Sequence, residues 1–265
     1  MHRLPLTLVF FASAFVGAPS ADALDPVLAH AIEQQKQTVG EAQKYTYTEH
    51  LKNINWDSKG KETLNMTDTY EITFLEGAPY KKHVLHNEQP LSDKEQRNEN
   101  KKIQDIAAAR RKGSAQHNLL HAAFHFELPL DQLASSCSIS AAGSEQLDGR
   151  DTLIFLAVPK PGTDMKQAAK DGVAYEIKLW VDQQDQVLRK ADAKVVGEGM
   201  RWEKDTLISY EFHKINGEAW LPSRFWFKGK VRYMLHDVPA EDEQIYFAYK
   251  KFHAVVKITV PTENQ

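Results

Sequence analysis

The chain has 265 residues, of which 33 are lysine or arginine and 36 are aspartate or glutamate, giving a net charge of −3 at pH 7. Neither sign forms a long run, so we expect no nucleic-acid partner. The single cysteine, Cys137, excludes an intramolecular disulfide, and packing has to stabilise the fold.

The first 23 residues have the order of a secretory signal peptide. A cationic start (His2, Arg3) precedes the apolar stretch 4–18, and the small-residue site Ala21-Asp22-Ala23 follows. We therefore predict cleavage near Ala23 and a periplasmic or secreted protein. No later stretch reaches the roughly 18 to 20 apolar residues of a membrane helix, so residues 24–265 are expected to form one domain without a transmembrane segment.

The start of the mature chain combines helix and strand signals. Asp25-Pro26 is a helix start, and apolar residues at helical spacing extend the helix to about Lys44. Alternating segments at 45–51 and 62–75 lie on either side of the turn residues 58–60. They predict a β-hairpin.

A helical insert is predicted at about 92–126, after a short strand at 82–86. Ser92 and Glu95 have the spacing of a capping box, which opens a polar helix. The second part of the insert, 114–126, is amphipathic. Its apolar side should pack on the sheet.

The rest of the chain is almost entirely β. Hairpin signals such as Asp148-Gly149 and Asn216-Gly217 separate the strands, so consecutive strands should pair as an antiparallel meander. The predicted strands lie at 138–147, 152–158, 174–182, 187–196, 206–215, 219–228 and about 246–260. About ten strands exceed what a flat twisted sheet holds easily. The predicted fold class is α+β, with a curved, mostly antiparallel β-sheet that forms an incomplete barrel covered by helices.

Alternation also predicts which side chains point inward. A curved sheet with an aromatic-rich concave face holds either a packed core or a cavity for an apolar ligand. The predicted lining residues are Tyr70, Ile72, Phe74, Tyr175, Ile177, Leu179, Ile208, Tyr210, Phe212, Leu221 and Phe225. Composition does not choose between a filled core and an open cavity.

Three segments after residue 146 resemble the outer-membrane lipoprotein-sorting superfamily (LolA/LolB-like). They are the run that begins Leu147-Asp-Gly-Arg150, the strand end Leu179-Trp-Val-Asp182, and the hairpin Asn216-Gly-Glu-Ala-Trp-Leu-Pro222. The resemblance implies an incomplete antiparallel barrel, covered by helices, that holds acyl chains or another hydrophobic molecule. Segment 45–51 lacks the arginine that lipoprotein carriers are expected to use in gating, so the resemblance implies a divergent member.

We predict a non-enzymatic periplasmic binding or carrier protein for a lipid or acyl chain, with no cofactor. An envelope-stress or protein-interaction module on the same fold, with a lipoprotein or envelope protein as partner, is the alternative. A metal-dependent hydrolase is a third hypothesis. The sequence contains no Gly-x-Ser-x-Gly elbow, His-Glu-x-x-His helix or phosphate-binding glycine loop to support catalysis.

The histidines give one metal-site pattern. His117, His121 and His125 recur every four residues and form a single stripe on a predicted helix. Neighbouring pairs could chelate an ion, but the outer two are about 12 Å apart along the axis, so a solvated helix face is the simpler interpretation. His83 and His86 differ in strand parity, and we expect them to point to opposite faces.

Two further groups have structural interpretations. Cys137 lies beside a strand and is expected to be a small packing residue, with an activated thiol as the alternative. Arg110, Arg111 and Lys112 complement the dipole at a helix end, with an anionic lipid headgroup as the alternative partner. Gly113 is then expected to stop the helix, with a lid hinge as the alternative.

Overall fold

The protein is represented by a computed structural model that describes residues 24–42, 44–112, 133, 136–162, 174–197, 203–233 and 236–252. Its helices are α1 (Pro26–Ala42) and α2 (Asp93–Arg111). Its strands are β1 (Tyr45–Trp56), β2 (Glu62–Leu75), β3 (Ala78–His86), β4 (Gln89–Pro90), β5 (Cys137–Leu147), β6 (Arg150–Pro159), β7 (Tyr175–Asp182), β8 (Leu188–Val195), β9 (Leu207–Ile215), β10 (Ala219–Tyr233) and β11 (His236–Lys251). The predicted signal peptide, the helix at 114–126 and the strand end at 253–260 lie outside the described residues.

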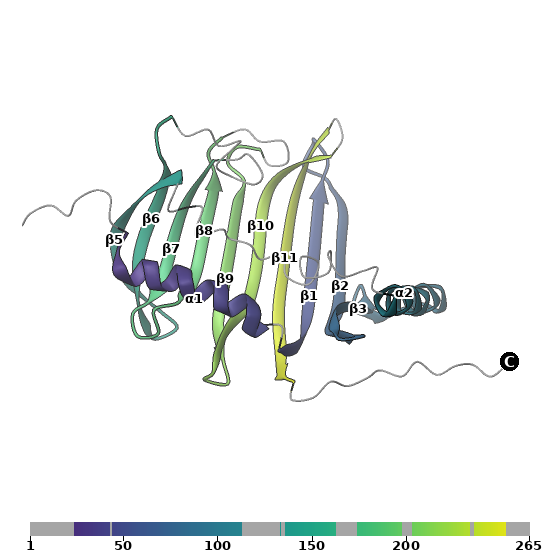
Figure 1. Ribbon diagram of the computed structural model, residues 1–265. Coiled ribbons are helices and arrows are strands. Elements are labelled where there is room, and N and C mark those ends of the chain that lie inside the picture. Colours follow the sequence, from purple (N-terminus) through teal and green to yellow (C-terminus); the bar gives the residue numbers. More distant parts are fainter. Residues whose placement is uncertain are drawn as a thin grey trace, which may run out of the picture.

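The described strands form one antiparallel sheet (Figure 1). Their order is β4-β3-β2-β1-β11-β10-β9-β8-β7-β6-β5, and the sheet does not close into a barrel. Sequential hairpins build each half, and β11 joins the halves because it pairs with both β1 and β10. The predicted fold class, a curved antiparallel sheet with covering helices, is confirmed. That residues 24–265 form a single domain stays a prediction.

Helix α1 covers part of one face of the sheet, which we call the α1 face. The Asp25 carboxylate accepts a hydrogen bond from the Val27 backbone N–H at 2.8 Å and caps the helix, as predicted. Leu28, Ala31 and Ile32 are buried in the same hydrophobic cluster as side chains of the sheet. Figure 1 shows α1 crossing the strands near one of their ends, and it packs on β7, β8 and β10.

Helix α2 begins at the predicted capping box and lies beside β3 (Figure 1). The Ser92 hydroxyl accepts the Glu95 N–H, and the Glu95 carboxylate accepts the Ser92 N–H at 2.8 Å. Ala107 is buried against Tyr80 of β3, whose hydroxyl donates to the buried Glu99 carboxylate at 2.5 Å. The helix therefore packs beside β3 near the edge of the sheet. An uncovered strand edge is prone to pair with other chains.

The last strand starts earlier than the alternation pattern predicts. β11 begins at His236 instead of about residue 246, and its first half is rich in acidic residues, which are unfavourable in strands. Partners on β10 compensate for them. Trp226 Nε1 donates to Glu241 at 2.9 Å, and Arg224 Nε donates to Glu243 at 2.7 Å. Cross-strand pairing thus extends β11 towards its N-terminus.

Gly229 allows β10 to pass close to the residues before β9. A Cβ atom at Gly229 would lie 2.3 Å from Thr206 Oγ1 and 2.7 Å from Thr206 Cβ, and Thr206 is fully buried. We expect Gly229→Ala to lower the free energy of unfolding by about 1–3 kcal/mol, because the buried threonine has to shift. Urea unfolding measures the loss, and adding Thr206→Gly should recover most of it. An unchanged midpoint in the single variant would contradict the contact.

Candidate functional site

The register of the sheet connects side chains of the α1 face into rows that cross several strands. One such row changes from apolar to polar along its length. From β6 to β3 it contains Phe155, Leu179, Ala191, Tyr210, Phe225, Gln244, Leu51, Asp68 and His86. We call the α1-face side chains of β6 to β10 the apolar side, and those of β11, β1, β2 and β3 the polar side.

Most of the predicted lining residues lie together on the α1 face. Seven of the eleven belong to one buried cluster that includes α1: Ile72, Ile177, Leu179, Ile208, Tyr210, Phe212 and Phe225. Tyr70 and Tyr175 pack against this cluster. Leu221 belongs to a separate, smaller cluster, and Phe74 contacts the Phe252 ring, with centroids 5.6 Å apart. The inward orientation is thus found for nine of them, and a cavity between them stays a prediction.

The polar side contains an ion pair with a buried carboxylate. Glu49 of β1 is 2 % exposed and lies 2.5 Å from the Lys81 ammonium of β3. Lys81 Nζ also lies 4.2 Å from the centre of the Tyr70 ring on β2. Burial, together with the charge of Glu49, raises the pKa of Tyr246 and Tyr249 well above the ordinary value, so both phenols stay protonated. Buried charges are costly, and such groups concentrate at functional sites.

Two groups on β11 continue the polar side. The Asn53 amide donates a hydrogen bond to Asp242, and burial raises the pKa of the Asp242 carboxyl. Gln244 is 7 % exposed and accepts a hydrogen bond from the Tyr246 hydroxyl at 2.6 Å. The polar side therefore contains hydrogen-bonding and ionisable groups from four adjacent strands.

The prediction that His83 and His86 point to opposite faces is wrong. Tyr70 pairs with His83 but Asp68 pairs with His86, so β3 carries one extra residue between these pairs. The bulge reverses the inward–outward alternation of β3 side chains between these two positions. Both imidazoles therefore point to the same face and reach the Asp68 carboxylate. His83 Nε2 lies 2.9 Å and His86 Nδ1 lies 2.8 Å from Asp68 Oδ1. The hydrogen bond with Asp68 raises the pKa of His86 above its ordinary value.

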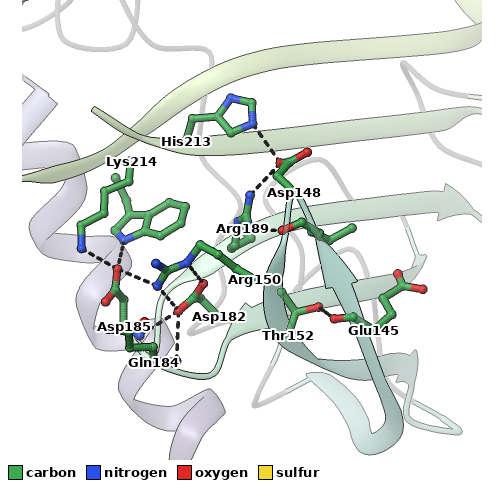
Figure 2. Close-up of polar contacts among 12 residues, drawn as sticks. Glu145, Asp148, Arg150, Thr152, Asp182, Gln184, Asp185, Arg189, His213 and Lys214 are labelled. Carbon is green, nitrogen blue, oxygen red and sulfur yellow. Dashed lines mark hydrogen bonds and ion pairs between the residues drawn. The ribbon is translucent and has the colours of Figure 1, made fainter. Parts of the chain in front are cut away.

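The segments that resemble the lipoprotein-sorting superfamily meet at one end of the sheet. Figure 2 shows Arg150 donating two hydrogen bonds to Asp182, from Nε at 2.6 Å and from Nη2 at 2.7 Å. Asp182 also accepts the backbone N–H groups of Gln184 and Asp185, at 3.0 and 2.8 Å. Asp185 in turn accepts a hydrogen bond from Trp220 Nε1 at 2.9 Å. These contacts connect β6, the β7–β8 turn and β10. Arg150, Asp182 and Trp220 of the three segments therefore have a structural role.

Of the remaining sequence candidates, the structure describes Cys137 and Arg110 but not the histidine stripe. Cys137 is buried in the α1-face cluster, and burial raises the pKa of its thiol, as expected for a packing residue. The Arg110 guanidinium donates to three backbone carbonyls of the β2–β3 region, a tertiary role that the dipole argument did not predict. The histidine stripe 117, 121 and 125 lies outside the described residues.

A groove of about 720 Å³ lies on the face opposite α1. Side chains of both charges line it together with aliphatic ones, among them Lys178, Asp192 and Leu207. Leu207 is 42 % exposed. This face therefore combines ion pairs, such as Lys190 with Asp192 at 3.0 Å, with exposed apolar surface. Within the part of the chain that the structure describes, neither helix is long and apolar enough to cross a membrane.

No known family profile and no curated protein sequence matches the chain. Its sheet is similar to that of an outer membrane lipoprotein-sorting protein domain from Vibrio parahaemolyticus, at 8 % identity over 86 % of this chain and 95 % of that chain, with a TM-score of 0.35. A LolA superfamily protein from Nitrosomonas europaea matches at 11 % identity over 87 % and 93 % of the two chains, with a TM-score of 0.32. The Mycobacterium tuberculosis lipoprotein LppX matches at 10 % identity over 88 % and 99 %, with a TM-score of 0.29.

At these identities and TM-scores the residue roles of those proteins do not carry over to this chain.

Proposed function

We propose that the protein is a non-enzymatic binding or carrier protein for an amphipathic, lipid-like ligand, which it binds on the α1 face. The observation that supports this function best is the change from apolar to polar along the rows of that face, as between Leu179 and Asp68. In this proposal the acyl chain lies along the apolar side and the head group meets the polar side.

A face that served only as a core would be apolar throughout, because each buried ion costs several kcal/mol in desolvation. The polar side instead contains Glu49 and Asp68, which are 2 % and 6 % exposed. Their hydrogen-bond and ion-pair partners come from the same face. A ligand with a polar head and an apolar tail matches both halves of this surface.

The energetics favour an acyl chain over a small polar ligand. Burying one methylene group contributes about 0.8 kcal/mol, so a chain of about ten methylenes contributes roughly 8 kcal/mol before ordering costs are subtracted. The net binding free energy is smaller by those ordering costs, so the Kd for such a chain is weaker than the roughly 1 μM that a net 8 kcal/mol would give. We also propose that the protein is periplasmic or secreted, because residues 1–23 have the order of a secretory signal peptide.

Phe225→Ala is expected to weaken binding of a fluorescent fatty acid at least tenfold. Phe225 lies on the apolar side next to Gln244 of the polar side, so the substitution removes a ring at the junction. Fluorescence titration of delipidated protein gives the affinity. The loss of a buried ring also costs about 3–5 kcal/mol of stability, so thermal unfolding has to show that the variant is folded under the assay conditions.

The control is Trp226→Ala, at the next position on the opposite face, where the indole donates to Glu241. It should retain the affinity of the unmodified protein, and Phe225→Leu, which keeps an apolar side chain, should lie between the two. Equal affinity of the Phe225 and Trp226 alanine variants would show that the ligand does not bind on the α1 face. Native mass spectrometry of protein taken from its own cells should show a bound lipid.

The protein-interaction hypothesis is favoured by a different observation. On the opposite face, Leu156, Val158 and Leu207 are each 42 % exposed beside the groove described above. Exposed apolar residues that are grouped in this way are typical of interaction surfaces. A stoichiometric protein partner in native mass spectrometry, without lipid, would favour this second function.

A further inference from the structure

We propose that Asp68, His83 and His86 form a binding site for a divalent transition-metal ion of the Zn²⁺ class. The three residues lie at the β2–β3 end of the polar side, and each offers one ligand atom. These atoms all lie within 4.8 Å of one another. The proposal depends on these side chains alone and is independent of the lipid-like ligand.

The bulge in β3 creates the convergence. Without the extra residue, the alternation of a strand would place positions 83 and 86 on opposite faces. With it, Tyr70 pairs with His83 and Asp68 pairs with His86, and both rings reach Asp68. Bulges are frequent beside functional sites because they redirect a side chain in this way.

The donor set and its spacing suit zinc. Imidazole nitrogen and carboxylate oxygen are both ordinary zinc ligands, with bonds of about 2.0–2.2 Å, which places tetrahedral ligand atoms roughly 3.3 Å apart. Asp68 Oδ1 is 2.9 Å from His83 Nε2 and 2.8 Å from His86 Nδ1. Shifts of a few tenths of an ångström would bring these two distances to the tetrahedral spacing. The two ring nitrogens, which lie within 4.8 Å of each other, must also be unprotonated, so on metal binding His83 Nε2 gives up its 2.8 Å contact with the Leu85 carbonyl oxygen.

Neighbouring groups hold the ligands in place. The Tyr70 hydroxyl donates to Asp68 Oδ2 at 3.2 Å, which leaves Oδ1 for the ion. The Tyr70 ring stacks on the His83 imidazole, with centroids 4.8 Å apart and planes at 27°. The Asn87 amide nitrogen lies 3.1 Å from His86 Nε2, the nitrogen that faces away from Asp68. When His86 binds an ion through Nδ1, Nε2 carries the proton, and the Asn87 amide turns so that its oxygen accepts that N–H. Partners of this kind orient metal ligands and raise affinity.

The site is open on one side. The Asp68 side chain is 8 % exposed, whereas those of His83 and His86 are 21 % and 35 % exposed, so an ion can enter from the histidine side. Three protein ligands leave at least one coordination position of a tetrahedral ion for water or for an anionic group of a ligand. An open position of this kind distinguishes the site from a closed structural zinc site.

Isothermal titration with zinc chloride tests the proposal, using the mature chain without an affinity tag. His117, His121 and His125 are replaced by glutamine in every sample so that the histidine stripe contributes no binding. We expect one zinc ion per chain, and we expect Asp68→Asn, His83→Gln and His86→Gln each to weaken binding at least tenfold. Cobalt substitution should add ligand-field absorption bands that these variants lose.

The matched control is His50→Gln, because His50 pairs with Glu88 at 2.8 Å on the other face of the sheet. It should bind zinc as tightly as the parent chain. If Asp68→Asn does not fold, the more exposed His86→Gln decides the outcome, with circular dichroism as the folding check. Absence of zinc binding in the parent chain, or equal binding by His86→Gln and His50→Gln, would overturn the proposal.

Discussion

Asp182→Ala is expected to lower the free energy of unfolding by about 3–5 kcal/mol. Asp182 is fully buried, accepts two hydrogen bonds from Arg150 and accepts two backbone N–H groups of the β7–β8 turn. Its removal leaves the Arg150 guanidinium with the Asp185 carboxylate at 3.2 Å and the Trp220 ring at 5.5 Å, and it frees two turn donors (Figure 2). Urea unfolding at neutral pH measures the loss.

The effect should depend on pH. Burial raises the pKa of Asp182, but the hydrogen bonds from Arg150 and from the Asp185 backbone outweigh it and hold the pKa below its ordinary value. A carboxyl whose pKa is lowered by folding stabilises the protein above its unfolded pKa, and the contribution is lost as the pH falls through the folded pKa. The difference between the parent chain and Asp182→Ala should therefore shrink below about pH 4.

Lys194→Ala serves as the control for this network. Lys194 pairs with Asp205 at 2.8 Å, but the two side chains are 49 % and 64 % exposed. Solvent screens a pair as exposed as this one, so this variant should unfold close to the parent midpoint. Equal midpoints for Asp182→Ala and Lys194→Ala would show that the buried network does not stabilise the fold.

Local signals in the sequence predict most of the fold. The Asp25 cap and the Ser92–Glu95 capping box are read from a few neighbouring residues, and both helices begin there. Asn-Gly and Asp-Gly turns and strict alternation give most of the strands because each hairpin is a local structure. The early start of β11 could not be predicted from local signals. Its acidic residues accept hydrogen bonds from Arg224 and Trp226, which belong to another strand.

The polar side could be predicted only in part. Asp68 shares strand parity with Tyr70 and Ile72, and this parity is the signal that a carboxylate points towards the apolar cluster. The alternation pattern marks Asp68 as a charged residue within an apolar face, but it does not indicate which residue pairs with it. The partners, His83 and His86, could not be found, because the bulge that aligns them arises from pairing between β2 and β3.

The polar side gives the second large expected effect. Lys81→Met should lower the free energy of unfolding by about 3–5 kcal/mol, because it removes the cation from a pair whose other partner cannot reach water. Glu49 is 2 % exposed, and its carboxylate lies 2.5 Å from Lys81 Nζ. The methionine keeps the length of the apolar stem over the Tyr70 ring, so the loss reports mainly on charge.

Lys82→Met is the matched control, since Lys82 lies on the opposite face, 3.9 Å from an exposed Glu71. It should change the unfolding midpoint little, because pairs at the surface contribute about 0–1 kcal/mol. Glu49→Gln combined with Lys81→Met should recover part of the loss, since the amide removes the unpaired buried charge. If the double variant is no more stable than Lys81→Met, the loss of stability comes from lost packing. The ion pair between Glu49 and Lys81 then does not stabilise the fold.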